Sequence, residues 1–304
     1  RSARSMKSLT VSGTFMCVPP SGSLRYGRSS SPLLRCHAVD ARGFLGLAPS
    51  HNPYRWTLPV ERRICVGGGF LFGGCGLGAA ISALEGTSGR TTVWATGQYL
   101  SYAKPGEVMD IDVTIAVEGH QITQARAVGH VGNREILTVN AALGDRPDMP
   151  SGQFVSMPDV PPPSDCPVLP HRVMGDGWVN DHLDERAVAV RPFEQRDGTL
   201  GTGNSLLWMR IPDVITGIDA AALGILGDFV PMGVGDALGI RGGGNSLDNT
   251  LRVLQPVPTE WVLVDVHIQG AERGFGHGTV NMFAEDGTLM AVASQSCIIR
   301  YWKP

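Results

Sequence analysis

The stretch Pro105–Ile115, PGEVMDIDVTI, has a counterpart 153 residues later in Pro258–Ile268, PTEWVLVDVHI. Apolar and polar residues alternate in both stretches, and the apolar positions are Met109, Ile111, Val113 and Ile115 in the first and Val262, Val264, Val266 and Ile268 in the second. This period of two is typical of a strand with one buried face. Because the same offset aligns residues 72–142 with residues 225–295, the chain is predicted to contain one fold twice.

Size and composition are those of a globular protein with two domains. The chain has 304 residues, of which 42% are hydrophobic and 17% charged. Its net charge of -3, without a long run of like charges, favours neither nucleic acid nor an anionic membrane as a partner. The longest apolar segment, residues 218–234, is interrupted by Asp219, Asp228 and Pro231, so no membrane span is predicted.

The cysteines and the N-terminal residues give information on the cellular compartment of the protein. The six cysteines show no paired spacing, which indicates reduced thiols and a cytoplasmic protein; they are Cys17, Cys36, Cys65, Cys75, Cys166 and Cys297. Residues 1–39 are rich in Ser and Arg and contain no acidic residue, so a disordered extension is predicted over residues 1–43. Its origin is open between a targeting segment, a cloning remnant and an upstream extension that begins before Met6.

Three folded or linking segments are predicted after this extension. The first repeat spans residues 44–143, a proline-rich linker spans residues 144–185, and the second repeat spans residues 186–304. In the first repeat, helical spacing within Gly67–Leu84 precedes strands near 90–102, 107–118, 121–131 and 135–142. In the second, strands near 186–191 and 206–211 precede a helix over 220–228, capped by Asp219, and strands near 246–255, 260–270, 273–284 and 288–300. This order predicts an α+β fold in which each repeat wraps an antiparallel sheet around a central helix.

Several familiar motifs are absent or incomplete. The glycine run Gly67–Ala79 contains G-x-G-x-x-A but lacks the preceding strand and the later acid of a dinucleotide site, so we expect its glycines to let strands pack closely on the helix. No G-x-S-x-G nucleophile motif occurs. A loose cluster lacks metal-ligand spacing and indicates a solvated surface; it comprises His171, Asp181, His182 and Asp184.

At three positions the second repeat has a polar residue where the aligned residue of the first repeat is mostly apolar. The 153-residue offset sets Asp228 against Cys75, Ser246 against Val93 and Gln295 against Ala142. One interpretation is a surface-facing or structurally satisfied acid. The other is a site in which Asp228 is the general base for a water that Ser246 and Gln295 orient beside a carbonyl carbon, with Pro231 loosening the helix nearby. On this second interpretation each chain has one active site, and the first repeat is structural.

At these residues the chain resembles the acyl-CoA thioesterase II family, over roughly residues 53–302. The motifs are ILGDF at Ile225–Phe229, SLDN at Ser246–Asn249 and SQSCIIR at Ser294–Arg300, together with Phe72–Gly74 and Lys104–Gly106. The resemblance implies a double HotDog fold, with two antiparallel sheets each around a central helix, and the catalytic residues Asp228, Ser246 and Gln295. Two residues depart from the family pattern: Ser246 replaces the usual threonine, and Asn249 stands where histidine is usual.

The resemblance implies hydrolysis of acyl-CoA thioesters to free fatty acid and CoA, a reaction of lipid metabolism that needs no metal or redox cofactor. We expect a monomer or homodimer, backbone amides around Gly73–Cys75 to stabilise the oxyanion, and Arg241 and Arg252 as candidates for the CoA phosphates. Two alternatives are a non-catalytic acyl-CoA-binding or scaffold protein and, less favoured by the residues, an enoyl-CoA hydratase-like enzyme. The hydratase would need a histidine a few residues from Asp228, where the sequence has none.

Overall fold

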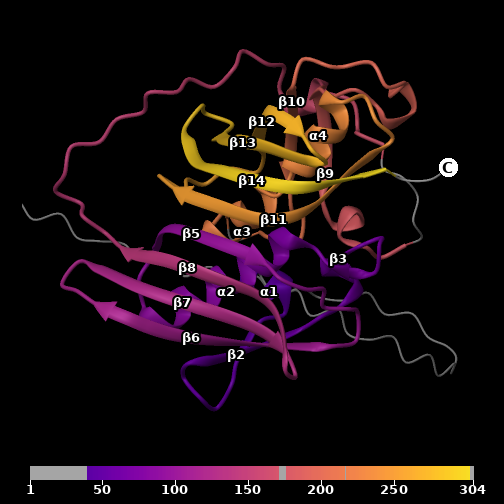
Figure 1. Cartoon of the computed structure of the whole chain (residues 1–304). Helices are drawn as coiled ribbons and strands as arrows, with labels where there is room; N and C mark the ends of the chain where they lie inside the picture. The colour runs from indigo at the N-terminus through magenta and orange to yellow at the C-terminus, as the bar shows by residue number, and fades with distance from the viewer. Residues whose placement is uncertain (1–39, 171–175, 216, 302–304) are drawn as a thin grey trace, which may run out of the picture. The chain divides into compact units, whose positions relative to one another are not determined.

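The described residues of the computed structural model, 40–170, 176–215 and 217–301, are organised around one twelve-stranded antiparallel sheet. Its strands lie in the order β1-β2-β6-β7-β8-β5-β11-β14-β13-β12-β10-β9 (Figure 1). Their bounds are β1 Ala48–Pro49, β2 Arg55–Pro59, β5 Thr92–Tyr99, β6 Val108–Glu118, β7 Ile122–Val131, β8 Arg134–Gly144, β9 Asp184–Ala189, β10 Asn204–Arg210, β11 Gly242–Val253, β12 Val262–Glu272, β13 Phe275–Ala284 and β14 Leu289–Tyr301. A separate pair joins β3 Cys65–Val66 to β4 Phe70–Leu71.

The strand order is symmetric about the pair β5 and β11, which confirms the duplication. From β5 the sheet continues through β8, β7, β6 and β2, and from β11 it continues through the corresponding strands β14, β13, β12 and β10. The prediction of two separate sheets is wrong, because β5 pairs with β11 from Trp94↔Arg252 to Gln98↔Asp248. This pairing gives hydrogen-bond partners to two strand edges that would otherwise be left open.

The longer helices lie on one face of the sheet (Figure 1). They are α2 Gly73–Ser88, α3 Ala220–Leu226 and α4 Val230–Ala237; the shorter elements are α1 Ala41–Leu45 and the 3-10 turns η1 Arg62–Ile64, η2 Pro163–Asp165, η3 Val179–His182 and η4 Phe193–Gln195. The helix predicted from the spacing within Gly67–Leu84 is confirmed as α2, which is buried without interruption from Gly74 to Leu84. The predicted cap of α3 is also confirmed, because the Asp219 carboxylate accepts a 2.8 Å hydrogen bond from Ala222 N.

Glycines in α2 serve both the predicted packing of strands on the helix, since a Cβ at Gly76 would lie 2.9 Å from Leu137 in β8, and packing against a second helix. A Cβ at Gly74 would lie 2.7 Å from Ile225 O, and one at Gly78 would lie 2.8 Å from Ala221 O. Both carbonyls belong to α3, so only glycine lets the two helices approach this closely. Because α2 is in the first repeat and α3 in the second, this contact brings the start of α2 next to the residues that follow α3.

The apolar segment Ala220–Ala237, which contains α3 and α4, is long and apolar enough to cross a membrane by length and composition alone. However, 83% of it is buried inside the fold. It therefore packs as the helical core of the second repeat, against the sheet and against α2.

The structure also bears on the predicted boundaries. Helix α1 begins at Ala41, inside the extension predicted to be disordered, and Asp40 caps it by accepting from Gly43 N at 2.7 Å; residues 1–39 lie outside the described residues. Strand β9 begins at Asp184, two residues before the predicted start of the second repeat. The cysteines within the described residues are free and buried, as predicted: Cys65, Cys75, Cys166 and Cys297.

Candidate active site

Asp228 lies at a break between α3 and α4. Helix α3 ends at Leu226, two residues earlier than predicted, and α4 begins at Val230 with Pro231 in its first turn. A proline is tolerated there because the first helical N–H groups have no intrahelical acceptor, whereas inside one continuous helix it would remove a hydrogen bond. The break leaves Asp228 outside both helices, with its side chain 4% exposed.

Three groups donate hydrogen bonds to the Asp228 carboxylate, and the structure thereby brings together all three predicted catalytic residues. Ser246 Oγ, from β11, donates to Oδ1 at 3.1 Å, and Gln295 Nε2, from β14, donates to the same oxygen. Gln295 Nε2 also lies 2.7 Å from Ser246 Oγ. On the other side, Gly74 N donates to Oδ2 at 2.6 Å. Serine and glutamine therefore hold the carboxylate itself.

The hydrogen bond from Gly74 to the Asp228 carboxylate was not predicted from the sequence. Gly74 lies in the first turn of α2, where backbone N–H groups have no partner within the helix and the helix dipole favours a negative charge. A Cβ at Gly73 would stand 2.6 Å from Asp228 Oδ2, which explains a glycine at this position as well. The backbone amides of Gly73–Cys75 were expected to stabilise the oxyanion. The amide of Gly74, in the middle of this stretch, donates to Asp228 instead.

Burial raises the pKa of Asp228 from its ordinary value to about 6. Removal of the carboxylate from water disfavours its charged form, and the hydrogen bonds from Gln295, Ser246 and Gly74 offset part of this effect. Among the described residues, no lysine, arginine or histidine forms an ion pair with Asp228. The pKa near 6 suits a general base that is ionised at neutral pH yet accepts a proton readily.

Aromatic side chains cover the start of α2 beside Asp228. Tyr99 Oη donates a 2.9 Å hydrogen bond to Gly73 O, and Phe72 packs edge-on against Phe229 with ring centroids 6.2 Å apart. Cys75, which the 153-residue offset aligns with Asp228, is also fully buried. These contacts place the carboxylate in mostly apolar surroundings, which is the physical cause of its raised pKa.

Strand pairing corrects two of the predicted counterparts. Gln295 lies opposite Gly278 in β13, and the position equivalent to Gly278 in β7 is Ala125, which lies opposite Ala141. Ala141, and not Ala142, is therefore the counterpart of Gln295. Since one residue of slip turns a side chain to the other face of a sheet, the 153-residue offset fails in these strands.

The same slip applies to β5 and β11. Ser246 lies opposite Cys297, as Thr92 lies opposite Leu143 in the first repeat, so Thr92 is its counterpart. Val93 stands at a register shift and is 37% exposed. The predicted contrast between Ser246 and an apolar residue is therefore wrong. Gln295 still corresponds to an apolar residue, Ala141, whereas Asp228 lies between two helices and its aligned residue Cys75 lies inside one.

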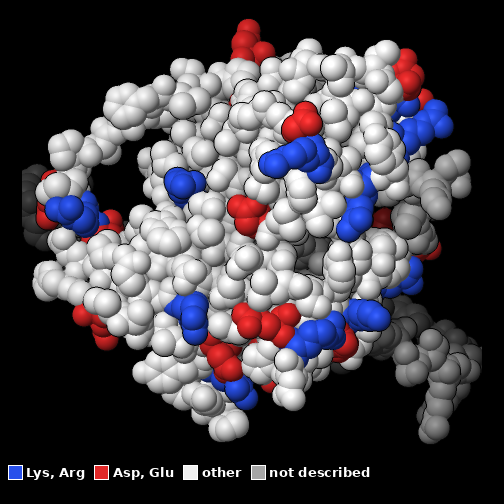
Figure 2. Space-filling view, in the orientation of Figure 1, with Lys and Arg blue, Asp and Glu red and all other residues white. Residues whose placement is uncertain are grey.

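The face of the sheet that is opposite to the helices and Asp228 carries a cavity of about 480 Å³. It is lined mainly by uncharged polar side chains, among them Thr96, Gln98, Asn140, His277 and Ser296. Successive side chains of a strand point to opposite faces of the sheet. Because Ser296 follows Gln295 along β14, and Gln295 contacts Asp228, the cavity lies across the sheet from Asp228. Figure 2 shows this face, whose middle carries few charged residues.

The predicted phosphate-binding arginines lie far apart. Arg241 immediately precedes β11 and Arg252 is near its end, and both are exposed. Eleven residues of extended strand span roughly 35 Å. The two arginines therefore cannot hold the same phosphate group.

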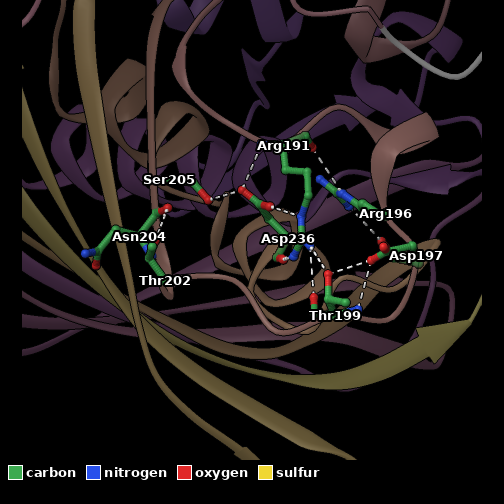
Figure 3. A network of polar contacts seen from close by, with 9 residues as sticks. Arg191, Arg196, Asp197, Thr199, Thr202, Asn204, Ser205 and Asp236 are labelled. Atoms are coloured by element: carbon green, nitrogen blue, oxygen red, sulfur yellow. Dashed lines mark hydrogen bonds and ion pairs between the residues drawn. The ribbon is translucent and has the colours of Figure 1, made fainter.

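A second buried carboxylate shows how a structural acid differs from Asp228. Asp236, at the end of α4, accepts a 2.8 Å hydrogen bond from Ser205 Oγ and pairs with Arg191 Nε at 3.3 Å (Figure 3). Arg191 also donates to Thr199 O at 2.9 Å, so the network ties the segment 191–205 to α4. Asp236 is neutralised by a cation, whereas Asp228 is held by uncharged donors.

The loose cluster near the linker also has structural partners. Asp181 accepts from Gly177 N, and Asp184 pairs with Arg210 at 2.6 Å. His182 Nδ1 is 3.4 Å from Asp213, while His171 lies outside the described residues. Within residues 40–170, 176–215 and 217–301, no group of three or more His, Cys, Asp or Glu residues could hold a metal ion.

Comparisons with known proteins identify relatives of this chain. The acyl-CoA thioesterase C-terminal domain family matches residues 163–299, which include Asp228, Ser246 and Gln295. A protein from Novosphingobium aromaticivorans assigned as a thioesterase is 30% identical, with a TM-score of 0.74 over 83% of this chain and 97% of that chain.

Two further solved structures share the fold. A protein with a hot dog fold from Alicyclobacillus acidocaldarius is 19% identical, with a TM-score of 0.73 over 84% of this chain and 97% of that chain. An acyl-CoA thioesterase II from Mycobacterium marinum is also 19% identical, with a TM-score of 0.67 over 86% of this chain and 99% of that chain. A search of curated proteins found no match. On its 30% identical relative, the chain belongs to the thioesterases, a family of enzymes; its residues 163–299 match the acyl-CoA thioesterase C-terminal domain, and it has a hot dog fold.

Proposed function

We propose that the protein hydrolyses acyl-CoA thioesters to a free fatty acid and CoA, with Asp228 as the general base. The observation that carries the proposal is a buried carboxylate with a pKa near 6 that is held by uncharged donors from both repeats. An ionised carboxylate has about four lone-pair sites on two oxygens. Oδ1 accepts from Ser246 and Gln295 and Oδ2 accepts from Gly74, so one site on Oδ2 remains for a proton of the attacking water.

The proposed reaction has two proton transfers. The water oxygen attacks the thioester carbonyl carbon while its proton moves to Asp228. The tetrahedral intermediate then collapses, the carbon–sulfur bond breaks, and the departing CoA thiolate takes the proton from Asp228. Atoms and charges balance without a cofactor. Ser246 and Gln295 act by fixing the orientation of the carboxylate, because both donate to Oδ1.

The contacts of Asp228 give no support to the hydratase alternative. The three groups that bond to its carboxylate are a serine, a glutamine and a backbone amide, and none is a histidine. The other alternative, a non-catalytic acyl-CoA-binding or scaffold protein, would have the same site geometry but would not hydrolyse the thioester. An activity measurement therefore separates the two.

The test is release of free CoA thiol from a panel of acyl-CoAs from two to sixteen carbons, with the wild type, Asp228→Asn and Asp286→Asn. Asp286 is an exposed turn residue whose carboxylate caps Thr288 N at 2.9 Å, and it serves as the matched control. We expect turnover in the wild type and the control and a loss of about 10²–10⁴ in kcat for Asp228→Asn. Binding without thiol release would support the scaffold, and full turnover by Asp228→Asn would show that another group is the base.

A further inference from the structure

A buried amide without a partner lies beside the proposed catalytic residues. Asn249 is 1% exposed, and within the part of the chain that the structure describes neither its Oδ1 nor its Nδ2 has a hydrogen-bond partner. It lies directly opposite Gln295 in the pairing of β11 with β14. Gln295 is 3% exposed, and its Oε1 also has no partner among the described residues. Three buried polar atoms are therefore unsatisfied on two facing residues.

Such a group of atoms needs an explanation. Native proteins leave few buried polar atoms without a hydrogen bond, because the water lost on burial is not replaced. Facing residues on adjacent strands have Cβ atoms about 5 Å apart, so the two amides share one neighbourhood on the helix side of the sheet. Gln295 reaches Asp228 with its nitrogen, and its oxygen is left for another contact.

The first repeat shows that the fold does not need these amides. By the strand pairing, Gln295 corresponds to Ala141, and Asn249, opposite Gln295, corresponds to Ala95, opposite Ala141. Both alanines are buried. These two positions are therefore occupied by alanine in the first repeat. They are polar only in the second repeat, which contains Asp228.

The donor and acceptor inventory indicates which group would pair with them. Asn249 Oδ1 and Gln295 Oε1 are acceptors, and Asn249 Nδ2 is a donor. A hydroxyl can donate to one of the acceptors and accept from the nitrogen, whereas a keto oxygen can only accept and would leave both oxygens unpaired. An unsubstituted hydrocarbon would leave all three atoms unpaired.

We propose that Asn249 and Gln295 Oε1 bind a hydroxyl carried by the first carbons of the acyl group, so that the enzyme prefers hydroxyacyl-CoA to unsubstituted acyl-CoA. The proposal rests on the thioesterase function proposed above, and it assigns a substrate class to the same site. Because Asn249 lies about 5 Å from Gln295, whose tip contacts Asp228, the hydroxyl belongs near the thioester.

The test compares kcat/KM for butanoyl-CoA with that for 2-hydroxybutanoyl-CoA and 3-hydroxybutanoyl-CoA, measured by thiol release. In the wild type we expect one hydroxy substrate to exceed butanoyl-CoA by about tenfold or more, because a site built for a hydroxyl discriminates against the analogue that lacks it. In Asn249→Leu, which has similar size and no polar atoms, the ratio should fall about tenfold. If leucine does not fit and the variant fails to fold, Asn249→Val is measured in its place.

The matched control is Asn140→Leu, the same substitution at an exposed position of β8 on the opposite face of the sheet, which should leave the ratio unchanged. A wild-type ratio near one, an unchanged ratio in Asn249→Leu or a preference for 3-oxobutanoyl-CoA would overturn the inference. Failure of the proposed function is a different result, because then no acyl-CoA in the panel of two to sixteen carbons would release CoA.

Discussion

The backbone N–H of Gly74 donates a 2.6 Å hydrogen bond to Oδ2 of Asp228, which lies 154 residues later in the chain. Gly74 lies in the first turn of α2 in the first repeat, and Asp228 follows α3 of the second. The first repeat thus contributes a backbone donor and a helix N-terminus to the acid of the second, which stabilises its ionised form. The first repeat, predicted to be structural apart from oxyanion donors around Gly73–Cys75, thus contributes a direct contact to Asp228.

The pH dependence of kcat/KM should report Asp228. Since the base must be ionised and burial raises its pKa to about 6, kcat/KM should rise about tenfold per pH unit below 6 and level off above it. The measurement is thiol release from one acyl-CoA between pH 4.5 and pH 8. A profile that is flat across pH 6 would contradict the assignment of Asp228 as the base.

The same pKa predicts a change in stability with pH. The pKa of Asp228 is about 6 in the folded protein and about 3.9 when unfolded, so its contribution to stability is fully present below pH 4 and is lost as the pH rises through 6. From pH 5 to pH 8 the wild type should lose about 1.4 kcal/mol of unfolding free energy relative to Asp228→Asn, which lacks this titration. Urea unfolding of both proteins at the two pH values measures the difference. Equal changes in both proteins would show that Asp228 has an ordinary pKa.

Substitution of Gly74 should impair both stability and turnover. In Gly74→Ala the new methyl would meet Ile225 O at 2.7 Å and Asp228 Cβ at 3.0 Å, so α2 must move away from α3 and from the carboxylate. We expect a loss of about 1–3 kcal/mol in unfolding free energy and a lower kcat.

The control for this substitution is Gly270→Ala. A Cβ at Gly270, in β12, would meet no atom within 4 Å, so this variant should stay within about 0.5 kcal/mol of the wild type and keep its activity. If Gly74→Ala behaves like Gly270→Ala, the close contact of α2 with Asp228 does not matter for the site.

The hydroxyl of Ser246 should matter more than its size. Ser246→Ala removes a donor to Asp228 Oδ1 and an acceptor for Gln295 Nε2, and we expect kcat to fall about tenfold or more, as for a lost hydrogen bond to a charged group. Ser246→Thr keeps the hydroxyl and should retain most of the activity. Equal losses in the two variants would mean that packing at this position is decisive.

Local patterns predicted the elements well, because they depend on neighbours in the chain. Alternation identified β6 and β12, and the Asp219 cap placed the start of α3. The end of α3 was predicted two residues late, since the chain breaks after Leu226 and a new helix with Pro231 in its first turn begins at Val230. Pairing across strands was less predictable: the joining of β5 to β11 and the one-residue slip at Gln295 depend on contacts between distant segments.

The sequence by itself determined the duplication and the long strands, and it singled out Asp228, Ser246 and Gln295 as candidate site residues, because periodicity and short motifs are local properties. Only the tertiary structure decided that Ser246 and Gln295 bind the carboxylate, that Gly74 donates to it and that Asn249 is buried without a partner. Burial, hydrogen-bond geometry and pKa all depend on which distant residues meet. In this chain they meet where α2 of one repeat packs against α3 of the other.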